Sequence, residues 1–171
     1  RAHFGSSVSS SAARAALGDD CKNPDIGRLV RGQLCSALVR IFWHGYKSAK
    51  LLGRHHLWAF FNDVRKKLDE VDKQSQLSLS RAVEVVNHSH ELVRNNDIKF
   101  RSLVCYGLNY KILHVWIALL SEDEPVVKKW FEEWSFIRSP SIRAQVIAAL
   151  NVLVEFPFCM SLDMEISAWD L

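Results

Sequence analysis

This sequence of 171 residues contains little that would break a helix, since only 7 residues are glycine and 4 are proline. Its four cysteines are scattered without a CxxC pair, and no apolar run approaches the roughly 18 residues of a membrane span. Hydrophobic residues make up 49% and charged residues 24%. This composition excludes a disordered chain, a collagen-like chain and a small disulfide scaffold. We expect reduced thiols in a cytosolic setting.

The motifs of common catalytic and cofactor sites are also missing. The sequence has no GxxxxGK(S/T), GxGxxG, GxSxG or HExxH pattern. His88 and His90 are two positions apart, and positions i and i+2 do not face each other on a helix. Glu132-Glu133 is read as a solvated helix face, because nothing nearby would raise a carboxyl pKa. We therefore expect no enzyme activity, no cofactor and no metal site.

Apolar residues recur every three to four positions along most of the chain, which is typical of helices. No internal repeat and no strand pair is expected. The prediction is an all-α fold, a compact single-domain bundle of about eight helices over residues 1–171. Because the chain begins at Arg1 without an initiator Met or a signal-peptide pattern, we expect a domain excised from a longer protein.

Several helix ends carry local signals. Asn23-Pro24 opens a helix whose apolar stripe runs from Ile26 through Leu29 to Phe42, and Arg28, Arg31 and Arg40 lie off this stripe and should meet water. Further starts are predicted by Asp97, Asn109, the acidic residues 122–124 and Ser139-Pro140-Ser141. The polar segment Lys73–Ser80 is predicted to be a loop.

Most of the aromatic and cysteine side chains are expected in the core. The prediction assigns Trp58, Trp116, Trp130 and Trp134 to the core, because they stand at helical spacing with other apolar residues. Cys35 and Cys105 lie in apolar stretches and are expected to act as small buried hydrophobes. Trp43, ahead of His44, is expected to be partly exposed.

Charge is sorted along the chain behind a formal net charge of +3. Residues 24–67 hold nine Lys/Arg against two Asp/Glu, a local +7, and residues 68–171 hold ten against fifteen, a local −5. The basic segment predicts either a docking surface for an acidic protein or anionic membrane, or an ordinary solvated face neutralised by the acidic helices. Nucleic acid is not expected, since the total charge is small and no aromatic-interleaved basic motif occurs.

Several blocks, in order across most of residues 2–160, resemble one known module. Leu38–Lys47 (LVRIFWHGYK) is similar to the first block of the RUN domain, although Tyr46 stands where Leu is usual. Phe100–Leu120 (FRSLVCYGLNYKILHVWIALL) is similar to its central block, and residues 121–137 (SEDEPVVKKWFEEWSFI) are similar to the acidic break and aromatic helix after that block. Ala2-His3-Phe4-Gly5 and Leu17–Leu29 (LGDDCKNPDIGRL) are similar to the RUN-and-SH3 adaptor branch, which includes nematode kinesin adaptors.

This resemblance implies an α-helical domain without catalytic activity in adaptors of vesicle traffic. Its implied partners are small GTPases of the Rab, Rap or Arf-like groups and kinesin-associated proteins. The implied location is cytoplasmic, peripheral to vesicles or along axons and microtubules, with any membrane association indirect. His44 and Lys47 are the candidate partner-binding residues carried over from the motif, and the charge argument adds Arg31, Arg40, Lys50 and Arg54.

Two other functions stay open at this point. The chain could serve as a scaffold that binds motor or kinase partners whatever the nucleotide state. It could also bind anionic lipid directly through the basic segment, in which case high salt should abolish binding by screening.

Charge reversal at Arg40, Lys47 and Lys50 is predicted to weaken binding to the partner while folding stays cooperative, because basic rim residues steer association with an acidic surface. A pull-down with GTP-loaded and GDP-loaded small GTPases measures the effect. Variants that bind as well as the parent would show that the basic segment is not the site.

Overall fold

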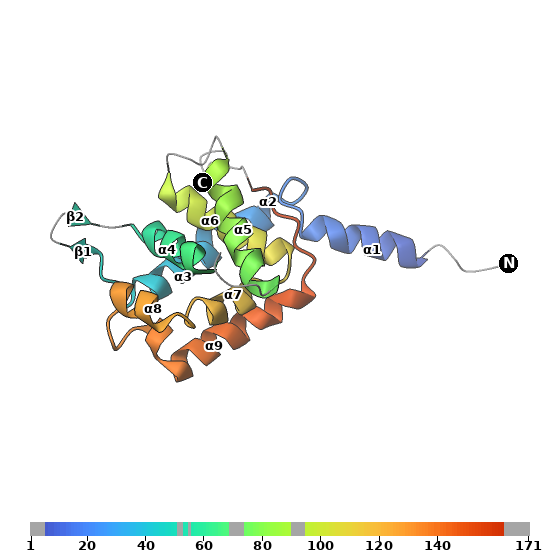
Figure 1. Cartoon of the computed structure of the whole chain (residues 1–171). Helices are drawn as coiled ribbons and strands as arrows, with labels where there is room; N and C mark the ends of the chain where they lie inside the picture. Colours follow the sequence, from blue (N-terminus) through green and yellow to red (C-terminus); the bar gives the residue numbers. More distant parts are fainter. Residues whose placement is uncertain (1–5, 51–52, 55, 69–73, 90–94, 163–171) are drawn as a thin grey trace.

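The computed structural model describes residues 6–50, 53–54, 56–68, 74–89 and 95–162, except for the side chains at 6–11, 49–50, 53–54 and 74–77. It confirms the all-α fold class: helices pack around one core, and α1 projects away from the body (Figure 1). The α-helices are α1 Ser6–Leu17, α2 Pro24–Gly27, α3 Cys35–Trp43, α4 Trp58–Leu68, α5 Gln74–His88, α6 Asn96–Asn109, α7 Leu113–Leu119, α8 Glu124–Trp130 and α9 Pro140–Asn151.

Shorter elements complete the described part. A π-helix, η1 Arg28–Leu34, joins α2 to α3, and two 3₁₀ turns, η2 Phe136–Arg138 and η3 Val152–Glu155, flank α9. The expectation of no strand pair is wrong, since β1 Ala49–Lys50 and β2 Gly53–Arg54 form a small antiparallel hairpin. This hairpin projects from the side of the molecule opposite α1 (Figure 1).

Local sequence signals explain most helix starts, with two corrections. Pro24 and Pro140 open α2 and α9, and the Asp123 carboxylate accepts a hydrogen bond of 2.9 Å from the Val126 amide at the start of α8. The cap of α6, however, is the Asn95 side chain and not Asp97. Asn109 caps no helix, because its amide group is used by the backbone of Met160.

The predicted loop at Lys73–Ser80 is also wrong. Lys73 lies outside the described residues, and Gln74–Ser80 forms the first half of α5. Tertiary contacts supply what the local sequence lacks: Leu79 is buried, and the Ser78 hydroxyl accepts a hydrogen bond of 3.0 Å from the Trp116 indole on α7. A weak local propensity is overridden here by packing.

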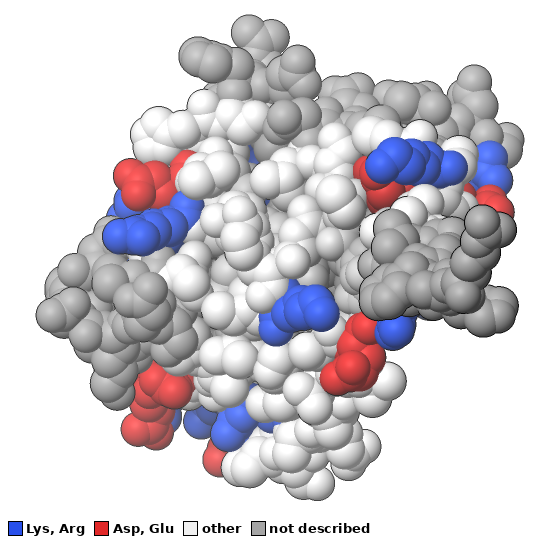
Figure 2. All heavy atoms as spheres, turned by 90° about the vertical axis from the view of Figure 1, so that its right-hand side faces the viewer, with Lys and Arg blue, Asp and Glu red and all other residues white. Residues whose placement is uncertain are grey.

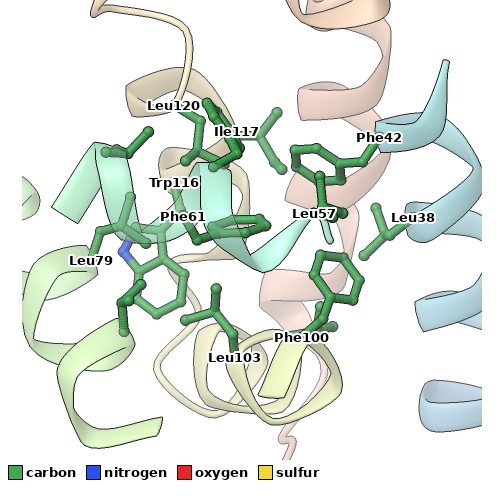
Figure 3. Packing of buried hydrophobic residues seen from close by; sticks show 14 of the residues in the cluster. Leu38, Phe42, Leu57, Phe61, Leu79, Phe100, Leu103, Trp116, Ile117 and Leu120 are labelled. Atoms are coloured by element: carbon green, nitrogen blue, oxygen red, sulfur yellow. The ribbon is translucent and has the colours of Figure 1, made fainter. Parts of the chain in front are cut away.

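Aromatic rings from several helices meet in the core, and Figure 3 labels Phe42, Phe61 and Phe100 among them. The Phe42 ring on α3 lies 5.5 Å from Phe61 on α4, 5.8 Å from Phe100 on α6 and 5.1 Å from Phe136 on η2, measured between ring centroids. Edge-on and tilted pairs at these distances add to the stabilisation from burial alone. Phe42 therefore links the first helical block to the later ones.

The cysteines follow the prediction. Cys35 and Cys105 are buried, and all four cysteines are free thiols. Burial raises the pKa of the Cys105 thiol to about 11, which makes it inert rather than nucleophilic.

Within the described residues, no single helix is long and apolar enough to cross a membrane. Among the described helices, α6 and α7 together are long and apolar enough, but they are bent by 117° relative to each other.

The segment after α9 returns across the bundle and is held by polar contacts. The Cys159 amide donates to the Gly18 carbonyl at 2.9 Å, and the Ser102 hydroxyl donates to the Leu162 carbonyl at 2.8 Å. Together with the Asn109 pair, these bonds tie residues 159–162 to α6 and to the turn after α1.

Substitution Phe42→Ala should lower the free energy of unfolding by about 3–5 kcal/mol, because it removes a fully buried ring and leaves a cavity between three others. Chemical denaturation measures the change. The exposed Val85→Ala on α5 is the control and should stay within about 0.5 kcal/mol of the parent. A loss below about 1 kcal/mol for Phe42→Ala would contradict its central position.

Candidate partner-binding site

The chain after α3 forms a backbone pair with the end of α8. The Lys47 amide donates to the Trp130 carbonyl at 2.8 Å, and the Glu132 amide donates to the Gly45 carbonyl at 2.8 Å. These two bonds flank an antiparallel bridge between Tyr46 and Phe131. The His-Gly-Tyr-Lys motif is thus joined to a segment more than 80 positions further along the chain.

Gly45 is the residue that allows this close approach. Its φ angle is +75°, a left-handed conformation that side chains disfavour. A Cβ atom at this position would lie 2.6 Å from the Cβ of Ser135. Both the backbone angle and the space therefore require glycine.

Tyr46 anchors the turn after α3 to the core. Its ring is buried and stacks on Trp130 with centroids 5.8 Å apart, and its hydroxyl donates to the His56 carbonyl at 2.9 Å. Burial raises the pKa of Tyr46, with a smaller contribution from the nearby charge of Asp63, so the hydroxyl stays protonated as a donor. A tyrosine at this position adds a hydrogen bond that leucine could not make.

Asp63 on α4 binds the indole nitrogen of Trp130. Its carboxylate accepts from the Trp130 indole at 2.9 Å and from Lys129 at 2.5 Å. Burial by itself would raise the pKa of Asp63, but the hydrogen bonds from Lys129 and Trp130 outweigh it and lower that pKa. Asp63 thereby connects α4 to the end of α8.

The two motif residues have different environments. The exposed His44 ring meets the Trp134 ring edge to face, with centroids 4.9 Å apart. Lys47 instead donates to the Lys128 carbonyl at 2.9 Å and lies 3.8 Å from Glu132. Lys47 thus serves the fold of the turn, whereas His44 is accessible.

Two tryptophans are exposed at this turn. Trp43 is 43% exposed, which confirms the prediction for it. The prediction that Trp134 belongs to the core is wrong, since it is 62% exposed, whereas Trp58, Trp116 and Trp130 are buried as expected. Helical spacing ceases to apply after α8 ends at Trp130, and the turn that follows directs Phe131 and Phe136 inward instead. We call Trp43, His44 and Trp134 the aromatic face.

The expectation that Arg31 meets water is wrong as well. Its side chain is 2% exposed and its Nη2 atom lies 2.8 Å from the Asp20 carboxylate, and it also donates to the Ser161 carbonyl. The cause is η1, because a π-helix places more residues in each turn than an α-helix and so rotates the faces. Leu29, expected in the buried stripe, is 50% exposed for the same reason.

The remaining predicted cations belong to α3 and to the hairpin. Arg40 is exposed on α3 and lines a surface hollow together with Arg31 and Arg101. Lys50 and Arg54 belong to the hairpin, paired with Gly53 and Ala49 respectively, and their side chains lie outside the described part. Arg101, which the sequence analysis did not single out, lines the same hollow as Arg40.

Several cations of the basic segment 24–67 pair with carboxylates. Ion pairs of the described residues in this segment include Arg28–Asp25, Arg31–Asp20, Lys47–Glu132 and Lys66–Asp63. On the face that carries α1, Lys and Arg lie beside Asp and Glu around much of the rim, and a cationic side chain also stands within the central white area (Figure 2). Asp25 and Asp63 belong to the segment and are already counted in its +7, so among these pairs only Arg31–Asp20 and Lys47–Glu132 reduce that charge.

A cluster of possible metal ligands, Asp19, Asp20 and Cys21, has its donor atoms within 4.8 Å of one another. Both Asp20 oxygens, however, accept hydrogen bonds from the Ser161 amide, and one also pairs with Arg31. Asp19 forms an ion pair with Lys22 and accepts a hydrogen bond from the Cys21 amide. These carboxylates are structural.

Comparison with known proteins agrees with the motifs that meet at this turn. The family model described as the RUN domain matches residues 33–164, most of the chain. The chain therefore belongs to the RUN domain family, which confirms the resemblance. Ala2-His3-Phe4-Gly5, part of that resemblance, lies outside the described residues.

The region aligned with each relative spans nearly all of this chain but less than a quarter of the relative's own length. Small G protein signaling modulator 3 of Homo sapiens is 38% identical over 175 residues, which cover 88% of this chain and 23% of that protein. Its homolog in Xenopus laevis is 35% identical, with 89% and 23% covered. AP-4 complex accessory subunit RUSC2 of Homo sapiens is 26% identical, with 94% and 11% covered.

Substitution Gly45→Ala should lower the free energy of unfolding by at least about 2 kcal/mol, since the left-handed angle and the contact with Ser135 both oppose a side chain. Thermal unfolding measures it. Gly32→Ala is the matched control, because a Cβ there meets nothing within 4 Å, and it should be neutral or slightly stabilising. Equal stability of the two variants would disprove the role of Gly45.

Proposed function

We propose that this chain is a non-catalytic protein-interaction domain that binds a small GTPase of the Rab, Rap or Arf-like type through the aromatic face. Membership of the RUN family supports this function, as does the name of the small G protein signaling modulators. The observation that carries the proposal is the exposure of Trp43 and Trp134 on a turn that is otherwise tightly held.

Exposed tryptophans at a rigid position are suited to be anchors of an interface. Tryptophan is enriched among the residues that dominate binding energy, and a large ring that is already ordered loses little entropy on association. The Trp43 ring meets the Tyr46 ring edge to face at 5.3 Å, and the Trp134 ring meets His44. Both rings are therefore partly oriented before a partner arrives.

The charged residues have a secondary part in the proposal. Arg40, Lys50 and Arg54 are kept as rim cations that steer an acidic partner toward the aromatic face. Arg31 and Lys47 are left out of the contact surface, because the first is buried against Asp20 and the second is engaged with Lys128 and Glu132.

Binding of this kind can depend on the nucleotide without any chemistry. The switch segments of a small GTPase are ordered by the triphosphate and released after hydrolysis. A rigid face that fits only the ordered form binds that form more tightly by its differential affinity. The proposal extends to an adaptor at vesicle surfaces in the cytoplasm that links cargo to kinesin motors, including along axons, and this extension rests on the resemblance alone.

Substitutions Trp43→Ala and Trp134→Ala should each weaken binding to the GTP-loaded partner by about thirtyfold, the loss typical of an anchor residue. A panel of Rab, Rap and Arf-like proteins, each loaded with GDP or a non-hydrolysable GTP analogue, is titrated in biolayer interferometry. Tyr110→Ala removes another exposed aromatic ring and is the control, expected to bind as the parent does.

Three results would decide against the proposal. Equal affinity for both nucleotide states would favour the scaffold function, and binding only to acidic vesicles would favour the membrane function. Normal binding by both tryptophan variants would move the site away from the aromatic face.

A further inference from the structure

A polar hollow of about 320 Å³ lies between the η1–α3 helix and the start of α6. This volume is near the lower end of the range for small-molecule sites, about 300–1,000 Å³. Side chains that bind anions and hydroxyl groups line it: Arg31, Ser36, Arg40, Asp97 and Arg101. We call this set the arginine hollow.

The arginines differ in how they are held. Arg31 is buried and fixed by Asp20, so its charge is balanced within the fold. Arg40 is exposed and Arg101 is half-buried, and neither has a carboxylate partner among the described residues. Two guanidinium groups from different helices are therefore available at one hollow, where charge-assisted bonds to phosphate are strong.

Arg31 and Arg101 both lie near the Cys35 thiol at the wall of the hollow. Burial is the main influence on the Cys35 thiol and raises its pKa, and the nearby Arg101 and Arg31 both oppose that rise. Cys35 also lines the hollow, so the side chains of Arg31 on η1 and Arg101 on α6 lie on the same part of its wall.

Asp97 adds a carboxylate, a hydrogen-bond acceptor, to the arginines of the hollow. Its Oδ1 atom lies 3.0 Å from His56 Nε2, and His56 Nδ1 accepts from the Trp58 amide, so Nε2 is the ring nitrogen that donates to Asp97. The second carboxylate oxygen and the Ser36 hydroxyl remain suited to ligand hydroxyls. A carboxylate beside arginines disfavours a bare phosphate ion but suits a ligand that carries both phosphates and hydroxyls.

We propose that the arginine hollow binds a phosphorylated polyol of the inositol phosphate type, with Arg40 and Arg101 on phosphate groups and Asp97 and Ser36 on ring hydroxyls. The ligand is either a soluble inositol phosphate or the same headgroup on a lipid. This site contains none of the residues of the aromatic face and shares only Arg40 with the rim cations of the proposed GTPase surface.

Isothermal titration with inositol trisphosphate tests the site directly. Arg40→Gln and Arg101→Gln should each weaken binding by at least about tenfold, because each removes charge-assisted bonds to phosphate. Arg28→Gln is the matched control: Arg28 belongs to the same helical run but pairs with Asp25 away from the hollow, and its loss should leave the affinity unchanged. Thermal unfolding verifies that all three variants are folded.

Asp97→Asn separates a polyol site from a simple anion site. Removal of the carboxylate charge should tighten binding of inorganic phosphate and reduce the preference for inositol trisphosphate over phosphate. The side-chain carbonyl of the substituted amide can still accept from His56, so the start of α6 should hold. The proposal would be overturned if the parent protein bound inorganic phosphate with the same affinity as inositol trisphosphate. It would also be overturned if both the Arg40 and the Arg101 variants kept the full affinity for inositol trisphosphate.

Vesicles identify the source of the headgroup. Flotation is compared between phosphatidylcholine vesicles that contain phosphatidylinositol bisphosphate and vesicles with phosphatidylserine at the same total charge. Binding only to the former, lost in Arg40→Gln, indicates the lipid. Binding of soluble inositol trisphosphate without flotation indicates the soluble form, and equal flotation with phosphatidylserine would contradict a specific site.

Discussion

The backbone pairing between Gly45–Lys47 and Trp130–Glu132 is the constraint on which the rest of this domain depends. It ties the end of α3 to the end of α8, and it brings Tyr46 onto Trp130 and Gly45 onto Ser135. Because Phe42 lies one turn before this pairing, the same constraint sets its ring among those of α4, α6 and η2. Core and turn are therefore parts of one arrangement.

This arrangement separates residues that maintain the fold from residues that can meet a partner. Within the His-Gly-Tyr-Lys motif, the contacts that stabilise the turn itself come from Gly45, Tyr46 and Lys47. The accessible groups are His44 and the tryptophans on either side of the pairing in sequence, Trp43 and Trp134. Under the proposed function, the family motif builds the support of the binding surface and supplies only part of its contacts.

A second constraint, the buried Arg31–Asp20 pair, connects η1 to the segment after α9. Removing either partner of such a pair leaves an uncompensated buried charge, which is strongly destabilising. The Ser161 amide also donates to Asp20, so the pair holds the returning segment as well as the helix. The cost of burying Arg31 is offset by these bonds, and its position gives the arginine hollow a fixed inner wall.

The sequence by itself determined the helical class, the family and the helix starts at Pro24, Asp123 and Pro140, since periodicity and capping are local properties. It also identified Trp43 as exposed. Only the tertiary structure decided that Arg31 is buried, that Trp134 is exposed and that Gln74–Ser80 is helical. These outcomes depend on the π-helical register, on the turn after α8 and on the contact with Trp116, and each of them arises from packing between distant segments, which a local pattern does not contain.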